Sequence, residues 1–239
     1  MPTQITWYGH NTWLVETGKH RLLIDPFLDD NPSAPIKAAD VDCDFVLVSH
    51  GHFDHVADAV SIAMRTGSTV LANFEVGNWL VGQGVAEDKV IGLNPGGGVD
   101  QPFGHLKMTI AHHSSSMPDG SYGGVACGLL LTLPEGSDGA HRRVYFACDT
   151  ALFLDMKLIA THNLSDRLDL AVLPIGDRFT MGPDDAVEAT KLINPVRVAP
   201  CHYGTWPPIE QDAAAWAAAV RKHTASEPLT PQPGEPFVL

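Results

Sequence analysis

Positive charge is scarce in this sequence. Of its 239 residues, 15 are lysine or arginine and 28 are aspartate or glutamate, so the formal net charge is −13. An acidic surface repels phosphate backbones, and basic residues gather no more densely than in pairs such as Arg142 and Arg143. We therefore expect no nucleic-acid partner.

Long apolar runs and secretion signals are also missing. The longest apolar stretch, near Val125–Leu133, is too short to span a bilayer. The first ten residues show no basic start followed by an apolar segment, so no signal peptide is predicted. Four cysteines occur without C-x-x-C spacing, at Cys43, Cys127, Cys148 and Cys201. These absences predict a cytoplasmic protein with reduced thiols and no membrane partner.

What the chain does contain is a series of short apolar stretches separated by turn signals. Strands are predicted at Ile5–Tyr8, Thr12–Glu16, Arg21–Asp25, Phe45–Ser49, Thr69–Ala72, Lys89–Leu93, Val99–Phe103, Leu106–Ala111, Cys127–Leu133, Arg143–Ala147, Leu170–Pro174 and Val196–Pro200. Helices are predicted at Asp54–Arg65, Phe74–Val81, Leu152–Ala160, Pro183–Ile193 and Gln211–His223. Each half of the chain begins with strands and continues with helix–strand alternation.

This order predicts an α+β fold of two mixed sheets packed on each other, with helices on the outer faces. Residues 1–239 are expected to form a single domain. The segment 227–239 carries four prolines, Pro228, Pro231, Pro233 and Pro236, and is predicted to be an extended tail.

The most informative segment is Ser49–His55, which reads S-H-G-H-F-D-H. It follows a predicted buried strand and opens a predicted helix. His50 and His52 are two residues apart on extended backbone, so both side chains can point the same way. Asp54 and His55 lie past the turn and can face a second position. Because imidazole and carboxylate suit zinc and related metals, the spacing predicts ligands for two metal ions.

The H-x-H-x-D-H pattern resembles the signature of the metallo-β-lactamase superfamily, whose fold is a four-layer αββα sandwich. Five further segments resemble the UPF0173 group of metal-dependent hydrolases, which lies near the ascorbate-6-phosphate lactonases: Gly9-His10, Ile24–Phe27, Asp149-Thr150, Pro174–Gly176 and His202–Trp206. The resemblance extends over most of the chain.

The resemblance implies two divalent metal ions, with zinc preferred and manganese or iron as alternatives. It implies this ligand set: His50, His52 and His113 on one ion, Asp54, His55 and His202 on the other, and Asp149 bridging both. His113 is preferred over the adjacent His112, which is then a neighbour of the ligand. Cys148 and Ala151 replace glycines that are usual in the family on either side of Asp149-Thr150. Cys148 and Cys201 are interpreted as small buried groups.

Several other residues are candidates to contact the substrate or a metal ligand. His10 fits that role, with a structural histidine as the alternative. Asp25 either orients a ligand imidazole or is a turn residue before a proline. Arg178 is the candidate cation for a substrate phosphate or carboxylate. Tyr203, like Asp177 and Trp206, is a candidate for the pocket wall.

The function implied is a hydrolase in which metal-bound hydroxide attacks an ester or lactone of a small molecule. Asp54 and Asp149 are the candidates to hold and orient the nucleophile. Phosphodiester hydrolysis is the alternative. A di-iron redox protein is less favoured, because such relatives usually carry Glu at the position of His52 and add a flavodoxin domain. A non-catalytic metal-binding protein is a further alternative, and the resemblance also implies a homo-oligomer.

Overall fold

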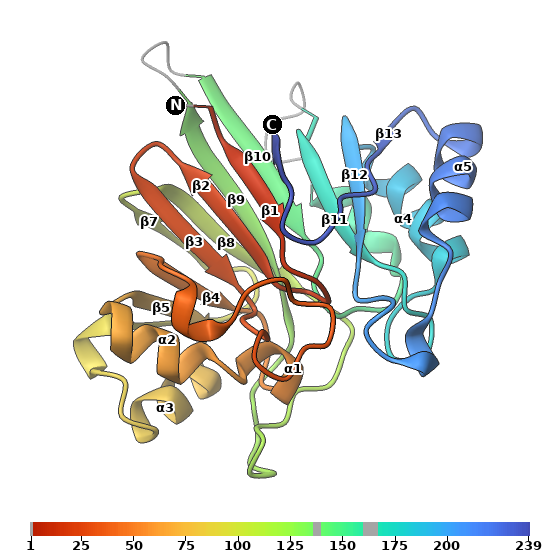
Figure 1. Cartoon of the computed structure of the whole chain (residues 1–239). Helices are drawn as coiled ribbons and strands as arrows, with labels where there is room; N and C mark the ends of the chain where they lie inside the picture. The colour runs from red at the N-terminus through yellow and green to blue at the C-terminus, as the bar shows by residue number, and fades with distance from the viewer. Residues whose placement is uncertain (1, 136–139, 160–166) are drawn as a thin grey trace.

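The strands form two sheets of seven strands each in the computed structural model, which describes residues 2–135, 140–159 and 167–239 (Figure 1). The first sheet has the order β14-β1-β2-β3-β4-β5-β6 and comprises Pro236–Val238, Gln4–Trp7, Trp13–Thr17, His20–Ile24, Phe45–Val48, Thr69–Asn73 and Val90–Leu93. The second has the order β13-β12-β11-β10-β9-β8-β7 and comprises Glu227–Pro228, Arg197–Cys201, Leu170–Pro174, Ala140–Phe146, Cys127–Glu135, Gly104–Ile110 and Gly98–Gln101.

Both sheets follow one plan. In the first, β1, β2 and β3 are antiparallel, and β4, β5 and β6 then continue in parallel from β3. In the second, β8, β9 and β10 are antiparallel, and β11, β12 and β13 then continue in parallel from β10. The mixed character of both sheets confirms the predicted fold class.

Alternating side chains divide the interior into three layers. Trp13 and Val15 of β2 pack between the two sheets, whereas Leu14 faces the helices. In β9, Leu129 and Leu131 likewise face the other sheet, and Leu130 faces the helix layer on its own side. Strands covered on both faces read as continuous apolar runs, which explains why these segments are recognisable in the sequence.

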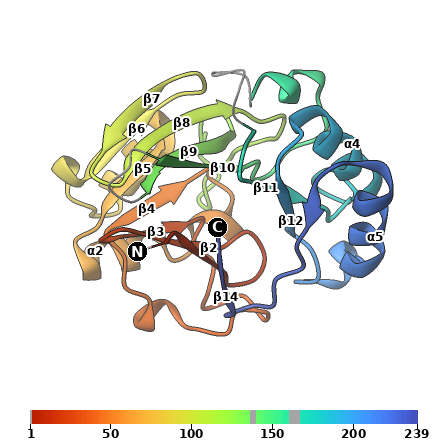
Figure 2. The ribbon, with the colours of Figure 1, turned by 90° about the horizontal axis from the view of Figure 1, so that it is seen from above.

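The helices cover the outer faces of the sandwich. Helices α1 (Phe53–Val56), α2 (Ala59–Thr66) and α3 (Phe74–Gly82) belong to the first sheet, and α4 (Pro183–Ile193) and α5 (Ala213–His223) to the second. The two groups lie on opposite sides of the molecule (Figures 1 and 2). In the described part of the chain, every helix is too short or too polar to cross a membrane.

The structure differs from the predicted elements in two places. The helix predicted at Asp54–Arg65 is broken between α1 and α2, because the Asp58 carboxylate accepts the backbone N–H groups of Leu28 (2.6 Å) and Asp29 (3.2 Å) and leaves the helical conformation. The helix predicted at Leu152–Ala160 is a 3-10 segment, η3 (Leu154–Leu158), and Ala160 lies outside the described residues.

The C-terminal segment joins both sheets. Within 227–239, β13 pairs with β12 of the second sheet, and β14 pairs with β1 of the first. The segment is extended, and its two ends complete an edge of each sheet instead of running freely over the surface.

Candidate metal centre

The predicted metal ligands lie at the carboxyl ends of strands from both sheets. Ser49–His55 follows β4, His113 follows β8, Asp149 follows β10, and His202 follows β12. Strands β8 and β10 are both antiparallel to β9, and β12 runs parallel to β10 through β11. All three strands of the second sheet therefore end at the same edge. That edge meets the end of β4, so side chains far apart in sequence converge there.

Three imidazoles form the first group. His50 Nε2 lies 3.0 Å from His52 Nδ1, and His113 Nε2 lies 3.3 Å from the same atom. Nitrogens at about 2.0–2.1 Å from a tetrahedral zinc ion are separated by about 3.3 Å. The spacing of these three nitrogens therefore fits the ligand set of one metal ion.

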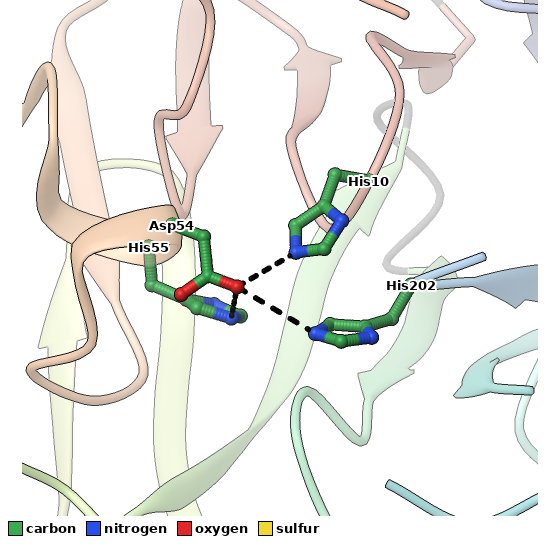
Figure 3. A group of neighbouring side chains, drawn as sticks. All are labelled: His10, Asp54, His55 and His202. Carbon is green, nitrogen blue, oxygen red and sulfur yellow. Dashed lines mark hydrogen bonds and ion pairs between the residues drawn. The ribbon is translucent and has the colours of Figure 1, made fainter. Parts of the chain in front are cut away.

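A second group combines carboxylates with the other histidines. Asp54 Oδ2 lies 3.9 Å from His55 Nε2 and 3.8 Å from His202 Nε2 (Figure 3). Asp149 Oδ2 lies 3.4 Å from His55 Nε2 and 3.0 Å from His202 Nε2.

Asp149 also reaches the first group. Its Oδ2 atom is 3.5 Å from His113 Nε2 and 4.0 Å from His50 Nε2. One carboxylate oxygen is thus near nitrogens of both groups, which is the placement that a bridging ligand requires.

Three buried atoms in this cluster make no hydrogen bond among the described residues, namely His55 Nε2, Asp149 Oδ1 and His202 Nδ1. A buried polar atom without a hydrogen bond is costly. A cation bound between these side chains would satisfy the first two atoms. The donor set and these two atoms therefore fit a metal centre.

Asp25 orients one imidazole of each group. Its carboxylate accepts hydrogen bonds from the Ser49 N–H (2.7 Å), the Ser49 hydroxyl (2.7 Å) and Asn11 Nδ2 (3.2 Å), and it lies 2.8 Å from His55 Nδ1. Since a carboxylate only accepts, His55 carries its proton on Nδ1. The Ser49 hydroxyl donates to Asp25, so it accepts from His50 Nδ1 at 2.9 Å. Both rings therefore direct the Nε2 lone pair into the cluster when they are neutral.

His10 is buried behind Asp54. Its Nε2 lies 3.0 Å from Asp54 Oδ2, and its Nδ1 lies 2.8 Å from the Thr205 hydroxyl (Figure 3). Burial lowers the pKa of His10 to about 4, so the ring is neutral near pH 7. Nε2–H then donates to Asp54, and Nδ1 accepts from Thr205. His10 is fully buried and therefore contacts a predicted ligand, not the solvent-accessible part of the site.

Electrostatics divide the cluster into neutral and charged members. Burial lowers the pKa values of three imidazoles, His50, His52 and His113. Burial also disfavours the charged forms of His55 and His202. The negative charge of Asp149 outweighs this effect and raises the pKa of both imidazoles. The pKa of His202 is raised to about 9. The first group is thus ready to bind a cation near neutral pH, whereas His55 and His202 must each first lose a proton.

The two carboxylates in the cluster are ionised. Burial favours the neutral form of Asp54, but His55 and His10 hold its pKa well below the usual range. Burial likewise favours the neutral form of Asp149, but His202 and His55 outweigh it and lower the pKa of Asp149. Two buried negative charges surrounded by imidazoles form an environment that attracts a divalent cation.

A cavity of about 870 Å³ opens over this cluster. Its lining includes five predicted ligands, namely His52, Asp54, His113, Asp149 and His202. The remaining walls come from the motif itself, the 114–118 loop, the 178–179 loop and Trp206. The metal-ligand cluster is therefore accessible to a small molecule.

Other residues named from the sequence lie elsewhere. The His112 ring packs against Phe153 with centroids 4.8 Å apart, outside the cavity lining. Tyr203 stacks on Trp7 at 5.4 Å, and burial raises its pKa to about 12. Cys148 and Cys201 are buried, and burial raises the pKa of both thiols well above the usual value.

Strained backbone is concentrated around the cluster. Five non-glycine residues at or beside the site adopt positive φ: His10, Asp25, Cys148, Asp177 and His202. This conformation is unfavourable for L-residues and persists only where the surroundings enforce it. Cys148 stands where the resembling family usually has glycine, so the φ of +53° explains that preference.

The sequence reasoning missed several contributors. Ser49, Thr205 and Asn11 act through hydrogen bonds to residues distant in the chain. Phe53 and Met117 line the cavity. Ser49 and Phe53 lie inside the segment Ser49–His55, and Thr205 lies inside His202–Trp206, so these three could have been nominated on that basis, whereas Asn11 and Met117 carry no local signal.

The chain is similar to known proteins along nearly its whole length. A family model described as a beta-lactamase superfamily domain matches residues 20–203. A UPF0173 metal-dependent hydrolase of Symbiobacterium thermophilum is 44% identical over 236 residues, covering 99% of this chain and 100% of the relative. Another, of Thermus thermophilus, is 42% identical over 219 residues, covering 92% of each chain. The structure of Igni18, a metallo hydrolase from Ignicoccus hospitalis, aligns with a TM-score of 0.86 and 31% identity, covering 100% of this chain and 99% of that one.

Proposed function

Because this chain belongs to the beta-lactamase superfamily, and within it to the UPF0173 metal-dependent hydrolases, we propose that it hydrolyses an ester or lactone of a small molecule at a pair of divalent metal ions. Zinc is the proposed metal, since imidazole nitrogens predominate among the donors and carboxylates complete the set. Four free, buried cysteines support a reducing location, the cytoplasm.

The proposed ligand sets follow the two groups. His50, His52 and His113 would hold one ion, while Asp54, His55 and His202 would hold the other. The observation that carries the proposal is the position of Asp149. Its Oδ2 atom is 3.0 Å from His202 Nε2 and 4.0 Å from His50 Nε2, so a single oxygen lies near nitrogens of both proposed ligand sets.

When bound, the ions would activate a water molecule near neutral pH and polarise the substrate carbonyl. Asp54 and Asp149 line the cavity floor and can each accept a hydrogen bond from the attacking water. The water oxygen joins the carbonyl carbon, the acyl C–O bond breaks, and the departing alcohol oxygen takes up the proton that the water has lost. His10 keeps Asp54 oriented for this step through its 3.0 Å hydrogen bond.

The test is metal analysis and turnover of the same preparations. We expect about two equivalents of zinc per chain and hydrolysis of γ- and δ-lactones or 4-nitrophenyl esters by zinc-reconstituted protein. Asp149→Ala is expected to lose metal and activity while it keeps its circular dichroism spectrum. Asp184→Asn, an exposed carboxylate on α4, is the matched control and is expected to keep both.

Three results would contradict the proposal. Two bound ions in Asp149→Ala would remove the bridging role. Fully metallated protein that cleaves bis(4-nitrophenyl) phosphate, but no lactone or carboxylic ester, would replace the proposed function by phosphodiester hydrolysis. A visible spectrum typical of oxo-bridged iron in the purified protein would instead favour a di-iron redox protein.

A further inference from the structure

Exposed aromatic rings surround the entrance of the cavity. Phe53 is 51% exposed and Phe179 is 57% exposed, although both are large apolar side chains. Both line the cavity together with Trp206, Met117 and Pro118. Exposed apolar side chains grouped around one opening indicate a binding surface. Their position above the metal-ligand cluster indicates that they contact the part of the substrate that does not react.

The wall formed by Phe53 and Trp206 is rigid. Phe27, which is fully buried, packs edge-on against Phe53 at 5.6 Å and lies 5.7 Å from Trp206. The Phe53 and Trp206 rings are themselves 6.1 Å apart. Rings held in this way offer apolar contact without a large loss of side-chain entropy on binding.

Arg178 is the one lysine or arginine among the lining residues of this cavity. In the part of the chain that the structure describes, no carboxylate forms an ion pair with its guanidinium group. The two carboxylates that line the cavity contact histidines instead. Asp54 lies 3.0 Å from His10, and Asp149 lies 3.0 Å from His202. The guanidinium carbon of Arg178 lies 6.0 Å from the centroid of the Phe179 ring. In a chain with a net charge of −13, a cation at a cavity that pairs with none of the described carboxylates is informative.

Backbone hydrogen bonds hold the loop that carries Arg178, whose side chain is exposed. Its N–H donates to the Gly176 carbonyl at 2.8 Å, and the Asp177 N–H donates to the Met181 carbonyl at 3.2 Å. The Met181 N–H in turn donates to the Thr150 carbonyl at 2.9 Å, next to Asp149. The loop that carries the cation is thus tied to the segment that carries the proposed bridging ligand.

We propose that Arg178 binds an anionic group of the substrate while Phe53, Phe179 and Trp206 hold an apolar body. The substrate class is therefore an amphipathic ester or lactone that carries one anionic group, a carboxylate or a phosphate. This inference rests on the proposed hydrolytic function. A single guanidinium pairs with one anion through two parallel hydrogen bonds. A cavity of about 870 Å³ falls within the range of small-molecule sites, roughly 300–1,000 Å³.

The experiment compares three rigid aryl esters with the same leaving group. These are 4-nitrophenyl benzoate, its 4-carboxy derivative and its 4-phosphono derivative, hydrolysed by the zinc-reconstituted protein. We expect kcat/KM to be higher for at least one anionic ester than for the neutral one. Arg178→Gln is expected to reduce that preference by about tenfold or more, since it removes a charge-assisted pair. The carboxylate and phosphonate arms identify which anion the site prefers.

Two variants control for general charge effects. Arg178→Lys retains the charge without the planar fork and is expected to keep part of the preference. Arg221→Gln removes an equal charge from an exposed position at the end of α5, outside the cavity. It is expected to leave the preference for anionic esters unchanged. An unchanged anionic-to-neutral ratio in Arg178→Gln would overturn the inference, as would an equal loss in Arg221→Gln.

A binding measurement separates this inference from the proposed reaction. Calorimetry would compare 4-phenylbutyrate with its neutral amide on the wild-type and Arg178→Gln proteins, with and without zinc. If no ester is hydrolysed but the carboxylate preference still depends on Arg178, the anion site stands and the proposed reaction fails. If the preference depends on zinc alone and survives in Arg178→Gln, the anion site is overturned.

Discussion

The carboxylate of Asp25 lies 2.8 Å from His55 Nδ1, and both side chains are fully buried. The same carboxylate accepts the hydroxyl hydrogen of Ser49, which in turn contacts His50 Nδ1. One buried acid therefore sets the ring orientation of a histidine in each proposed ligand set. Its influence extends to both proposed metal positions, although it lies outside them.

The first prediction follows from this relationship. Asp25→Asn is expected to weaken the binding of both zinc ions by about 10–100-fold, because carboxylates that orient metal-bound imidazoles have effects of this size. Ser49→Ala interrupts only the path to His50, so it is expected to weaken mainly one of the two ions. Chelator competition with a zinc indicator would measure both. Equal losses in the two variants would contradict separate paths from Asp25.

The second prediction concerns pH. His202 has a pKa of about 9 because Asp149 outweighs its burial, so it is protonated at pH 7 and must lose that proton to bind a metal ion. Zinc affinity is therefore expected to rise between pH 7 and 9, by about tenfold per pH unit for each proton displaced. Calorimetry in buffers of different ionisation enthalpy would count the released protons. Binding without proton release near pH 7 would contradict the predicted charge state.

The third prediction concerns the close approach of the 114–118 loop to the motif. A Cβ atom at Gly51 would lie 2.5 Å from Met117 Sδ and 3.1 Å from the Ser116 carbonyl oxygen. Gly51→Ala is therefore expected to destabilise the protein by about 1–3 kcal/mol and to displace the loop. Gly82→Ala on α3 meets no atom within 4 Å and is the matched control. Thermal unfolding of both would show the difference, and equal melting temperatures would refute the packing argument.

The fourth prediction concerns the C-terminal strand. β14 pairs with β1 through the register Ile5 with Phe237, and Phe237 packs against the core between the sheets. Deletion of residues 235–239 is expected to lower the melting temperature and to promote aggregation, because it uncovers the edge of the first sheet. Phe237→Ala should have a smaller effect, since it keeps the backbone ladder. A deletion with unchanged melting temperature and solubility would show that β14 is dispensable.

Much of the fold could be predicted because its signals are local. Strands such as β4 and β11 are continuous apolar runs between turn residues. The H-x-H-x-D-H segment is equally local, since four donor side chains occur within six residues and follow a buried strand. The order of the elements then brings the ends of β8, β10 and β12 to one edge.

The remainder depends on contacts between distant residues. The break between α1 and α2 is set by hydrogen bonds from Leu28 and Asp29 to Asp58, which are 29 or 30 residues away. The bond from Thr205 to His10 spans 195 residues. Neither contact leaves a pattern in its own neighbourhood, so propensity and periodicity could not reveal it. The placement of Tyr203 against Trp7 is likewise a consequence of packing between strands.

The proposed ligands are divided across the seam of the sandwich, with His50, His52, Asp54 and His55 attached to one sheet and His113, Asp149 and His202 to the other. Cations held there would add a link between two halves that are otherwise joined by apolar contacts, by hydrogen bonds such as that between His10 and Thr205, and by the C-terminal segment. Loading the protein with metal should then suppress any partial opening in which one sheet loosens before the other. Loss of metal would make the two halves unfold less cooperatively, even though neither half changes its own hydrogen-bonded ladder.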